Sequence, residues 1–438
     1  MEKLRETLKV KKERAILVAA VLRGSQNGDD LVELTALAES AGAIVVDRFQ
    51  QKISRINPSM YIGTGKAKEL AERVRRFKAD VVIFDNDLSP AQIRELEKIL
   101  KVKVLDRSEL ILDIFATRAK TRQAKLQVEL AQLEYTYPRL TKMWTHLERV
   151  AGAGGGTSAG AVGGIGTRGP GEKQLEVDRR LVNRRITDLK KELAHIDERK
   201  LREITGRKSK FKVCLVGYTN AGKSTLLNKL TYSSVFVEDR LFATLDTRTR
   251  KWVLERGVDV LLSDTVGFVR NLPHQLVASF KATLEEAVNA DLLIHVADVS
   301  NSDVLGQIEA VNQVLEEIGC TDKSVLLVLN KLDIVKQKGK LEMLQTLFPK
   351  ALCLSAKRAV GLEQLKRGVL DEYKGEELLL KIVSRQSNGK VQHFLRAFGS
   401  VIQETYADSA VQIKVRLGSN QLAELKRLHP VSVEIIQN

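Results

Sequence analysis

The chain has 438 residues, which at roughly 150 residues per domain argues for about three domains and against a single core. Its composition, 43% hydrophobic and 29% charged, is ordinary for a soluble globular protein. The charge is not ordinary: 71 Lys and Arg against 55 Asp and Glu leave a formal net charge of +16, which indicates a polyanionic partner.

The three cysteines exclude two classes of protein. Cys214, Cys320 and Cys353 form no CxxC pair and no Cys/His cluster, so a disulfide scaffold and a local zinc site are ruled out and a reducing cytosol fits. The apolar run from Ala15 to Leu22 follows a basic segment, but it is short and no small-residue cleavage site follows. We interpret it as a first strand. No apolar stretch approaches the roughly 18 residues of a membrane span, so we expect a cytoplasmic protein with at most peripheral membrane contact.

Residues 15 to about 115 alternate between apolar and amphipathic stretches. AILVAAVL, AIVVD, ADVVIFDND and KVKVLD have the pattern of strands, and DLVELTALAESAG, KAKELAERVRRF and SPAQIRELEKIL have the pattern of helices. This alternation predicts a parallel α/β domain over residues 1–115. Gly63, Gly65 and Lys66 precede a helix and could bind the phosphate of a second nucleotide, although a plain glycine turn is the commoner origin of such a pattern.

Residues 116–210 have no strand pattern. They carry 21 Lys and Arg against 11 Asp and Glu, a net charge of +10, and ten glycines lie between Gly152 and Gly171. Apolar residues on both sides of the glycines are spaced three, four or seven apart: Leu126, Leu130, Leu133 and Tyr137 before them, and Leu175, Val182, Ile186, Leu189, Leu193 and Ile196 after them. This spacing predicts a basic antiparallel helical hairpin whose second helix, Lys173 to Glu203, is ~46 Å long.

Four arginines lie close together in the second helix. Arg179, Arg180, Arg184 and Arg185 are either a solvated helix face or a surface that binds RNA or another polyanion, and the residues alone leave both alternatives open.

Residues 211–373 form a second α/β region, in which the apolar strand FKVCLVG leads into a GxxxxGK[ST] loop and then a helix. The predicted GTP-binding residues of this loop are Gly217, Tyr218, Thr219, Asn220, Ala221, Gly222, Lys223, Ser224 and Thr225. The glycines let backbone N–H groups surround phosphate oxygens, Lys223 reaches the β and γ phosphates, and the Ser224 hydroxyl binds Mg²⁺.

Four more motifs follow in the order of a GTP-binding domain. Their predicted nucleotide-binding residues are Phe242, Ala243, Thr244, Leu245 and Asp246; Asp264, Thr265, Val266 and Gly267; Asn330, Lys331, Leu332 and Asp333; and Ser355, Ala356 and Lys357. Thr244 completes the Mg²⁺ shell, Asp264 holds the metal through water, and the Gly267 N–H senses the γ-phosphate. The Asp333 carboxylate matches the N1–H and N2–H₂ donors of guanine, and a backbone N–H near Ala356 serves O6, so GTP is favoured over ATP.

Catalysis is less well determined by the sequence. Phe268 follows Gly267, where Ras-like GTPases commonly have the Gln that orients the attacking water, so we expect slow unaided turnover. Asn220 either binds an activating K⁺, as in potassium-activated GTPases of the GxxNxGKS type, or stabilises the loop.

The pattern of residues 374–438 predicts a small α+β domain. It has the helical stretches KVQHFLRAFGSVI and QLAELKRL between strand-like ones, and no motif that carries chemistry.

Taken together, GYTNAGKST, LFATLD, DTVGFVRNLPHQLVASFKATLEE and NKLD, with GIGTRGPGEKQLEVDRR ahead of them, resemble the HflX family of translation-factor-related bacterial GTPases. The resemblance runs from about Ala15 to at least Tyr373. The sequence departs from the family at Lys173, where Thr is common, and at Thr247, where Pro is common.

The resemblance implies a cytoplasmic and partly ribosome-bound GTPase, and we expect a monomer. It implies binding of GTP and GDP, contact with the 50S subunit and its 23S rRNA, and the splitting of stalled or hibernating 70S ribosomes. The implied rRNA contacts are Gly155, Gly156, Gly163, Gly164, Arg168, Lys173, Arg179, Arg180 and Arg184.

Three other functions compete with this one. A GTPase that acts in ribosome assembly or RNA remodelling would share every nucleotide motif. NKLD and SAK argue against a metabolic P-loop kinase or ATPase, and the intact magnesium and base motifs argue against an RNA-binding protein with a relic pocket.

Overall fold

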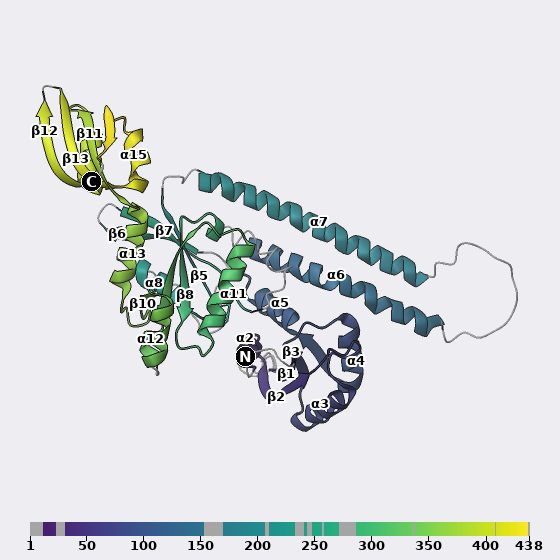
Figure 1. The fold of residues 1–438 in the computed structure, drawn as a ribbon. Coiled ribbons are helices and arrows are strands. Elements are labelled where there is room, and N and C mark those ends of the chain that lie inside the picture. Colours follow the sequence, from purple (N-terminus) through teal and green to yellow (C-terminus); the bar gives the residue numbers. More distant parts are fainter. Residues whose placement is uncertain are drawn as a thin grey trace, which may run out of the picture. The chain divides into compact units, whose positions relative to one another are not determined.

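Figure 1 shows the computed structural model. It describes residues 12–22, 31–152, 170–205, 210–232, 241–242, 248–255, 258–270, 286–335, 338–407 and 409–436. The chain forms two compact units. One consists of Met1–Arg207, Glu238–Asp246 and Val266–Leu284, and the other of Lys208–Val237, Thr247–Thr265 and Glu285–Asn438.

The first unit contains a four-stranded sheet in the order β2-β1-β3-β4, in which all neighbouring strands are parallel. The strands are β1 (Arg14–Leu22), β2 (Ile44–Ile53), β3 (Val81–Phe84) and β4 (Lys103–Asp106). Helices α3 (Thr64–Phe77) and α4 (Pro90–Leu100) cover one face, and α2 (Val32–Ser40) and α5 (Arg107–Arg118) cover the other. Burial on both faces explains why β1 and β3 are continuously apolar, and the predicted α/β class is confirmed.

The glycines before α3 lie at a helix start. Gly63 is the N-cap residue, so Gly65 and Lys66 belong to the first turn of the helix. The Lys66 ammonium is paired with Glu69 of the same helix at 2.6 Å. The stretch therefore has the geometry of an ordinary helix entry.

A buried carboxylate joins this sheet to the helical hairpin. Asp106 ends β4 and accepts hydrogen bonds from the backbone amide of Glu109 at 2.9 Å and from the Tyr135 hydroxyl at 2.5 Å. The first bond caps α5, a helix that the sequence reading did not separate from its surroundings. The second fixes the first hairpin helix, so the hairpin starts from a defined point on the α/β domain.

The predicted hairpin consists of α6 (Arg122–Gly152) and α7 (Pro170–Thr205), which lie side by side. Helix α7 starts three residues before the predicted Lys173, at a proline that suits the first turn of a helix. Apolar residues spaced three or four apart on the two helices pack together: Leu126, Leu130, Leu133, Ile186, Leu189, Leu193 and Ile196. Ion pairs along the seam, such as Arg185 with Glu129 at 2.7 Å, add to this apolar contact.

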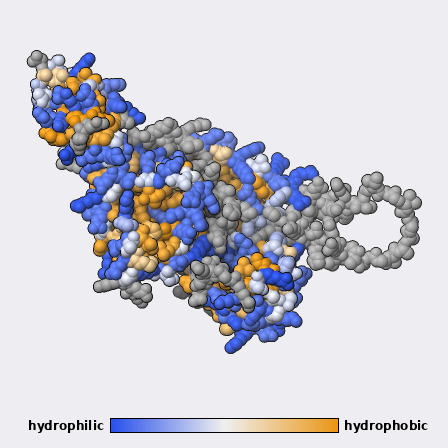
Figure 2. Space-filling model, viewed as in Figure 1, coloured by the Kyte–Doolittle hydropathy of each residue, from blue (hydrophilic) through white to orange (hydrophobic). Residues whose placement is uncertain are grey.

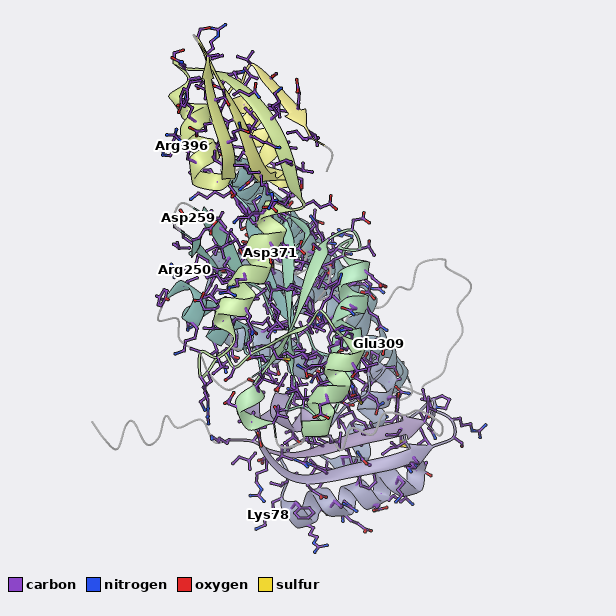
Figure 3. The ribbon with its side chains drawn as sticks, turned by 60° about the vertical axis from the view of Figure 1, so that its left-hand side comes forward. Lys78, Arg250, Asp259, Glu309, Asp371 and Arg396 are labelled. Atoms are coloured by element: carbon purple, nitrogen blue, oxygen red, sulfur yellow. The ribbon has the colours of Figure 1, made fainter. Side chains whose placement is uncertain are left out.

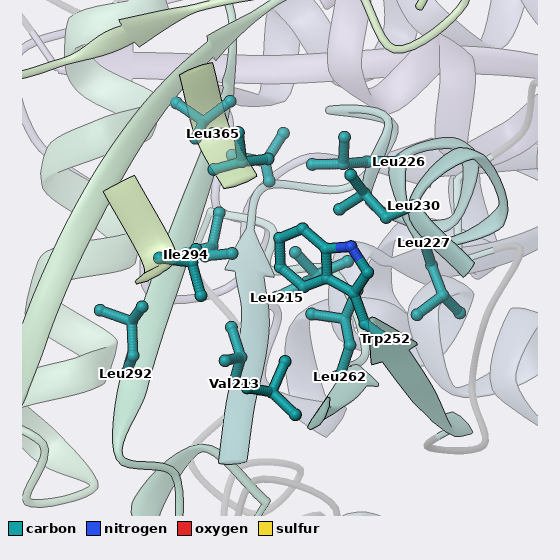
Figure 4. Packing of buried hydrophobic residues seen from close by; sticks show 14 of the residues in the cluster. Val213, Leu215, Leu226, Leu227, Leu230, Trp252, Leu262, Leu292, Ile294 and Leu365 are labelled. Atoms are coloured by element: carbon teal, nitrogen blue, oxygen red, sulfur yellow. The ribbon is translucent and has the colours of Figure 1, made fainter. Parts of the chain in front are cut away.

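The second unit is built on a six-stranded sheet in the order β10-β9-β8-β5-β7-β6, parallel except for the β6–β7 pair. The strands are β5 (Lys212–Gly217), β6 (Arg248–Glu255), β7 (Val258–Asp264), β8 (Leu292–Asp298), β9 (Ser324–Asn330) and β10 (Leu352–Cys353). Helices α8 (Lys223–Thr231) and α13 (Leu362–Lys374) cover one face around the buried Trp252 (Figure 4). Helices α11 (Val304–Glu317) and α12 (Lys338–Leu347) cover the other. This part has the predicted GTPase-like architecture.

The C-terminal part of this unit is an antiparallel sheet in the order β12-β13-β11-β14. Its elements are β11 (Glu377–Arg385), α14 (Gly389–Phe398), β12 (Ser400–Ala407), β13 (Ala410–Gly418), α15 (Leu422–Arg427) and β14 (Ser432–Ile435). The predicted α+β class is confirmed.

One predicted element of this domain is wrong. The helix expected over KVQHFLRAFGSVI ends at Phe398, and β12 begins at Ser400. Gly399 lies at the boundary, where a Cβ atom would be 2.6 Å from Val415 Cγ2 and 2.9 Å from the Leu395 carbonyl oxygen. Val401 then pairs with Val415 across the sheet, a contact that no local periodicity reveals.

Among the described residues, no helix is long and apolar enough to cross a membrane. On the face drawn in Figure 2, apolar residues form patches between hydrophilic ones.

Candidate nucleotide-binding site

The glycine loop lies between the end of β5 at Gly217 and the start of α8 at Lys223. Gly217 has φ +146° and Gly222 has φ +97°, values that L side chains rarely adopt. A Cβ atom on Gly217 would lie 2.2 Å from the Val296 carbonyl oxygen, and one on Gly222 would lie 2.3 Å from Asn330 Nδ2. The sheet and the Asn330 side chain therefore require both glycines.

Lys223 is buried at the start of α8. Its ammonium donates hydrogen bonds to the carbonyl oxygens of Gly217 and Tyr218, both at 2.9 Å. Burial lowers its pKa to about 8, and the nearby Asp264 carboxylate opposes that shift. The loop thus holds a cation beside backbone amides at a helix N-terminus, which is the arrangement that binds phosphates.

Ser224 and Asp264 supply the oxygens expected of a Mg²⁺ site. The Ser224 hydroxyl donates to Asp264 Oδ2 at 2.6 Å, and Asp264 is fully buried at the end of β7. A hydroxyl and a carboxylate side by side at the phosphate loop are oxygen ligands of the kind that Mg²⁺ prefers, so these residues fit the metal, with the carboxylate acting through water. The buried Thr219 Oγ1 of the same loop has no hydrogen-bond partner among the described residues.

The base-recognition motifs meet at the carboxyl ends of β9 and β10. Asn330 ends β9, and its Nδ2 group donates to the Ala221 carbonyl oxygen at 2.8 Å. Its Oδ1 atom accepts from the Ala356 amide at 3.0 Å, so one side chain joins the phosphate loop to the Ser355–Lys357 loop.

Asp333 is the residue predicted to select guanine. Its Oδ1 atom accepts from the Ser355 hydroxyl at 2.6 Å, and this hydrogen bond holds the pKa of the carboxyl below its usual range. Asp333 therefore remains a carboxylate, the form that accepts from guanine donors.

The sequence reading missed Asp298, which pairs with Lys331 of the same motif at 2.8 Å. Asp298 ends the apolar strand β8, and this position could have identified it as a candidate site residue because open α/β sheets bind ligands at the carboxyl ends of their strands.

Two segments that contain predicted nucleotide-binding residues, Glu238–Asp246 and Val266–Leu284, belong to the first compact unit. Ala243, Thr244, Leu245 and Asp246 lie outside the described residues. Phe242 is 2% exposed and packs edge-on against Phe115 of α5, with ring centroids 4.5 Å apart. The Leu241 amide donates to the Ser40 hydroxyl oxygen at 3.2 Å. The sequence assigned Phe242 to GTP binding, and the structure gives its ring a partner in the N-terminal domain.

The second of these segments begins at Val266, so Gly267 and Phe268 belong to it. Phe268 is 2% exposed, and its apolar ring cannot orient a water molecule.

The predicted RNA-contacting residues fall into two groups. Arg179, Arg180 and Arg184 of α7 are exposed and form no ion pair within the described part of the chain, whereas Arg185 is paired with Glu129. Lys173 belongs to the helical backbone of α7. Gly155, Gly156, Gly163, Gly164 and Arg168 lie outside the described residues.

Three family models match successive parts of the chain. Residues 28–116 match the N-terminal region of GTP-binding GTPases, residues 118–207 match the middle region of the same proteins, and residues 212–331 match the 50S ribosome-binding GTPases.

Curated proteins of three bacteria are similar to this chain over nearly their whole length. GTPase HflX of Caldanaerobacter subterraneus subsp. tengcongensis is 42% identical, covering 94% of this chain and 92% of that protein. GTPase HflX of Lacrimispora saccharolytica is 41% identical, covering 95% and 96%. GTPase HflX of Escherichia coli is 39% identical, covering 97% and 98%.

We predict that nucleotide affinity falls as pH rises through the pKa of Lys223. With a pKa of about 8 in the free protein, the protonated fraction drops from about 0.9 at pH 7 to about 0.1 at pH 9. Bound phosphates favour the charged lysine, so the Kd for GDP measured by calorimetry should rise about tenfold over this range. Lys223→Arg keeps its charge and serves as the control: an equal pH dependence in that variant would assign the effect to other groups.

We predict that Asp333→Asn shifts the preference from guanosine to xanthosine nucleotides, because the amide offers a donor where the carboxylate accepts. Competition binding of GTP and xanthosine triphosphate measures this. Asp322→Asn, an exposed change in the same domain, is the matched control. Unchanged GTP affinity in Asp333→Asn would exclude the base assignment.

Proposed function

The chain belongs to the HflX family of GTPases, and on that premise we propose that it binds the 50S subunit and splits stalled or hibernating 70S ribosomes in a GTP-dependent way. One observation carries the proposal. A GTPase domain of the 50S ribosome-binding type shares its chain with a hairpin whose second helix exposes Arg179, Arg180 and Arg184, which form no ion pair with the described residues.

We propose the following roles for the nucleotide site. Lys223 binds the β and γ phosphates, and the N–H groups of the loop from Gly217 to Gly222 surround them. Ser224 and Thr244 bind Mg²⁺ directly and Asp264 binds it through water. When bound there, Mg²⁺ would supply positive charge that stabilises phosphoryl transfer to water.

Guanine is held by Asp333, while Asn330 keeps the two base loops together. The Ala356 amide already donates to Asn330, so the donor to guanine O6 comes from a neighbouring amide of the Ser355–Lys357 loop. The remaining predicted residues of these motifs complete the pocket.

Hydrolysis needs a charge or a group that Phe268 does not supply. We propose that K⁺ provides it through Asn220. This residue is exposed in the phosphate loop with φ +60°, and its side chain has no hydrogen-bond partner in the described part of the chain, which leaves its amide oxygen available to a cation.

RNA binding by the hairpin follows from electrostatics. Exposed cations that neutralise phosphates release condensed counterions, so affinity depends steeply on salt. Of the four clustered arginines, Arg185 is engaged with Glu129, and we propose that Arg179, Arg180 and Arg184 contact 23S rRNA. The glycine-rich segment, with Gly155, Gly156, Gly163, Gly164 and Arg168, then approaches folded rRNA with its backbone.

We further propose that the protein is a monomer that works in the cytoplasm, partly on ribosomes. Its domains are residues 1–115, 116–210, 211–373 and 374–438. A role in ribosome assembly or RNA remodelling would use the same nucleotide site, and the first experiment below separates the two.

Sedimentation of 70S ribosomes with the protein and GTP tests the function. We expect conversion to free subunits, and intact 70S ribosomes at saturating protein would favour the assembly function. Arg179, Arg180 and Arg184→Gln should weaken 50S binding and make the slope of log K against log salt shallower by about three, while GTP binding is unchanged.

Two controls sharpen this prediction. Lys390, Lys426 and Arg427→Gln remove three exposed cations from other helices and should leave splitting intact. Deleting residues 152–171 should abolish splitting and retain GTP binding, and the loss of both would mean that the hairpin is structural.

We predict faster GTP hydrolysis in KCl than in NaCl at equal ionic strength. The difference should disappear in Asn220→Ala, and single-turnover rates with and without 50S subunits measure it. Equal rates in the two salts would remove K⁺ from the mechanism.

A further inference from the structure

The C-terminal domain has a sheet with one covered face and one open face. Its elements follow the order β-α-β-β-α-β, a split β-α-β arrangement. Residues of α14 and α15 pack on one face with the alternate residues Leu380, Ile382, Val411, Ile413 and Val415 of the central strands. The intervening residues of β11 and β13 therefore form the open face.

The open face brings cations together at its centre. Lys381 of β11 lies directly opposite Lys414 of β13, and Arg416 follows on the same face of β13. In the described part of the domain, these three side chains form no ion pair. Like charges directly opposite each other in a sheet destabilise it, so their position calls for a compensating anion.

The acids on this face do not supply that anion. Glu434 of β14 is the neighbour of Lys381 in the sheet register, and Glu377 lies at the far end of β11, but neither forms an ion pair with these cations. Gln403, Thr405 and Gln412 surround the cations with uncharged hydrogen-bonding groups.

On the covered side of the same domain, one cation has an anion within the domain. Arg396 of α14, labelled in Figure 3, donates to both carboxylate oxygens of Glu404 at 3.1 and 2.9 Å and contacts the Tyr406 hydroxyl at 3.3 Å. Arg396 thus has its anion within the domain, whereas Lys381, Lys414 and Arg416 have no ion-pair partner among the described residues.

The residue types indicate which anion fits. Sheets of this topology that read single-stranded RNA do so with aromatic residues on their central strands, on which bases stack. Here no residue on the open face of β11 or β13 is aromatic. Cations flanked by amides and hydroxyls suit phosphate and ribose oxygens instead.

We propose that the open sheet face of the C-terminal domain, formed by Lys381, Lys414 and Arg416, binds the phosphate backbone of double-stranded RNA without reading its sequence. This surface is separate in the sequence from the hairpin cations. It predicts RNA binding that does not require ribosome splitting.

Binding of a mixed-sequence RNA duplex to the full-length protein, measured over a salt series, tests the proposal. Lys381, Lys414 and Arg416→Gln should weaken binding and make the slope of log K against log salt shallower by about three. Lys390, Lys426 and Arg427→Gln, the same charge change on α14 and α15, should have a smaller effect. Replacing Lys381 and Lys414 by Arg should retain affinity, which separates lost charge from a damaged fold.

The open-face substitutions and the α14 and α15 control substitutions are also introduced into the variant that carries Arg179, Arg180 and Arg184→Gln. The open-face effect should persist there, because the two surfaces act independently, whatever the outcome of the splitting assay. Wild-type duplex affinity in the open-face variant, or equal loss in the α14 and α15 control, would overturn the proposal. The proposal would also be overturned if the open-face variant lost binding to polyglutamate but bound RNA as before, because that result would indicate an acidic protein partner.

Discussion

The nucleotide site depends on the buried carboxamide of Asn330. Its Nδ2 group holds the Ala221 carbonyl oxygen of the phosphate loop, and its Oδ1 atom holds the Ala356 amide of the second base loop. Both partners are backbone groups of buried residues, so replacing the carboxamide would remove two hydrogen bonds from a buried site. The 2.3 Å approach that a Cβ on Gly222 would make to Nδ2 shows how closely the loop fits this side chain.

The hairpin and the C-terminal domain each contain both paired cations and cations without an ion-pair partner among the described residues. Some cations are paired with an acid on a neighbouring element, as Arg185 is with Glu129 and Arg396 is with Glu404. Exposed pairs of this kind contribute little to stability, so their main effect is to fix which cations remain free. The basic residues behind the net charge of +16 thus include some that are paired within the fold and others that have no such partner among the described residues.

The contacts of Leu241 and Phe242 with Ser40 and Phe115 join a segment far along the chain to the N-terminal domain of the same unit. Phe242 has φ +56°, an unusual conformation for an aromatic residue, and its ring is almost fully buried against a helix some 130 residues earlier in the chain. No motif in the sequence marks this pairing, because it arises from the packing of α5 and not from local spacing. The same is true of the bond between Tyr135 and Asp106.

The sequence by itself determined the nucleotide motifs, the parallel α/β domain and the hairpin, because glycine-loop geometry, strand burial and heptad-like spacing are local properties of the chain. Tertiary structure alone decided where α14 stops, since Val401 joins the sheet only through its partner Val415. It also decided that Asp298 supports Lys331, and that Lys381 and Lys414, 33 residues apart, meet on one open face. Strand register is a long-range property, and so the fate of each charge became visible only once the strands were paired.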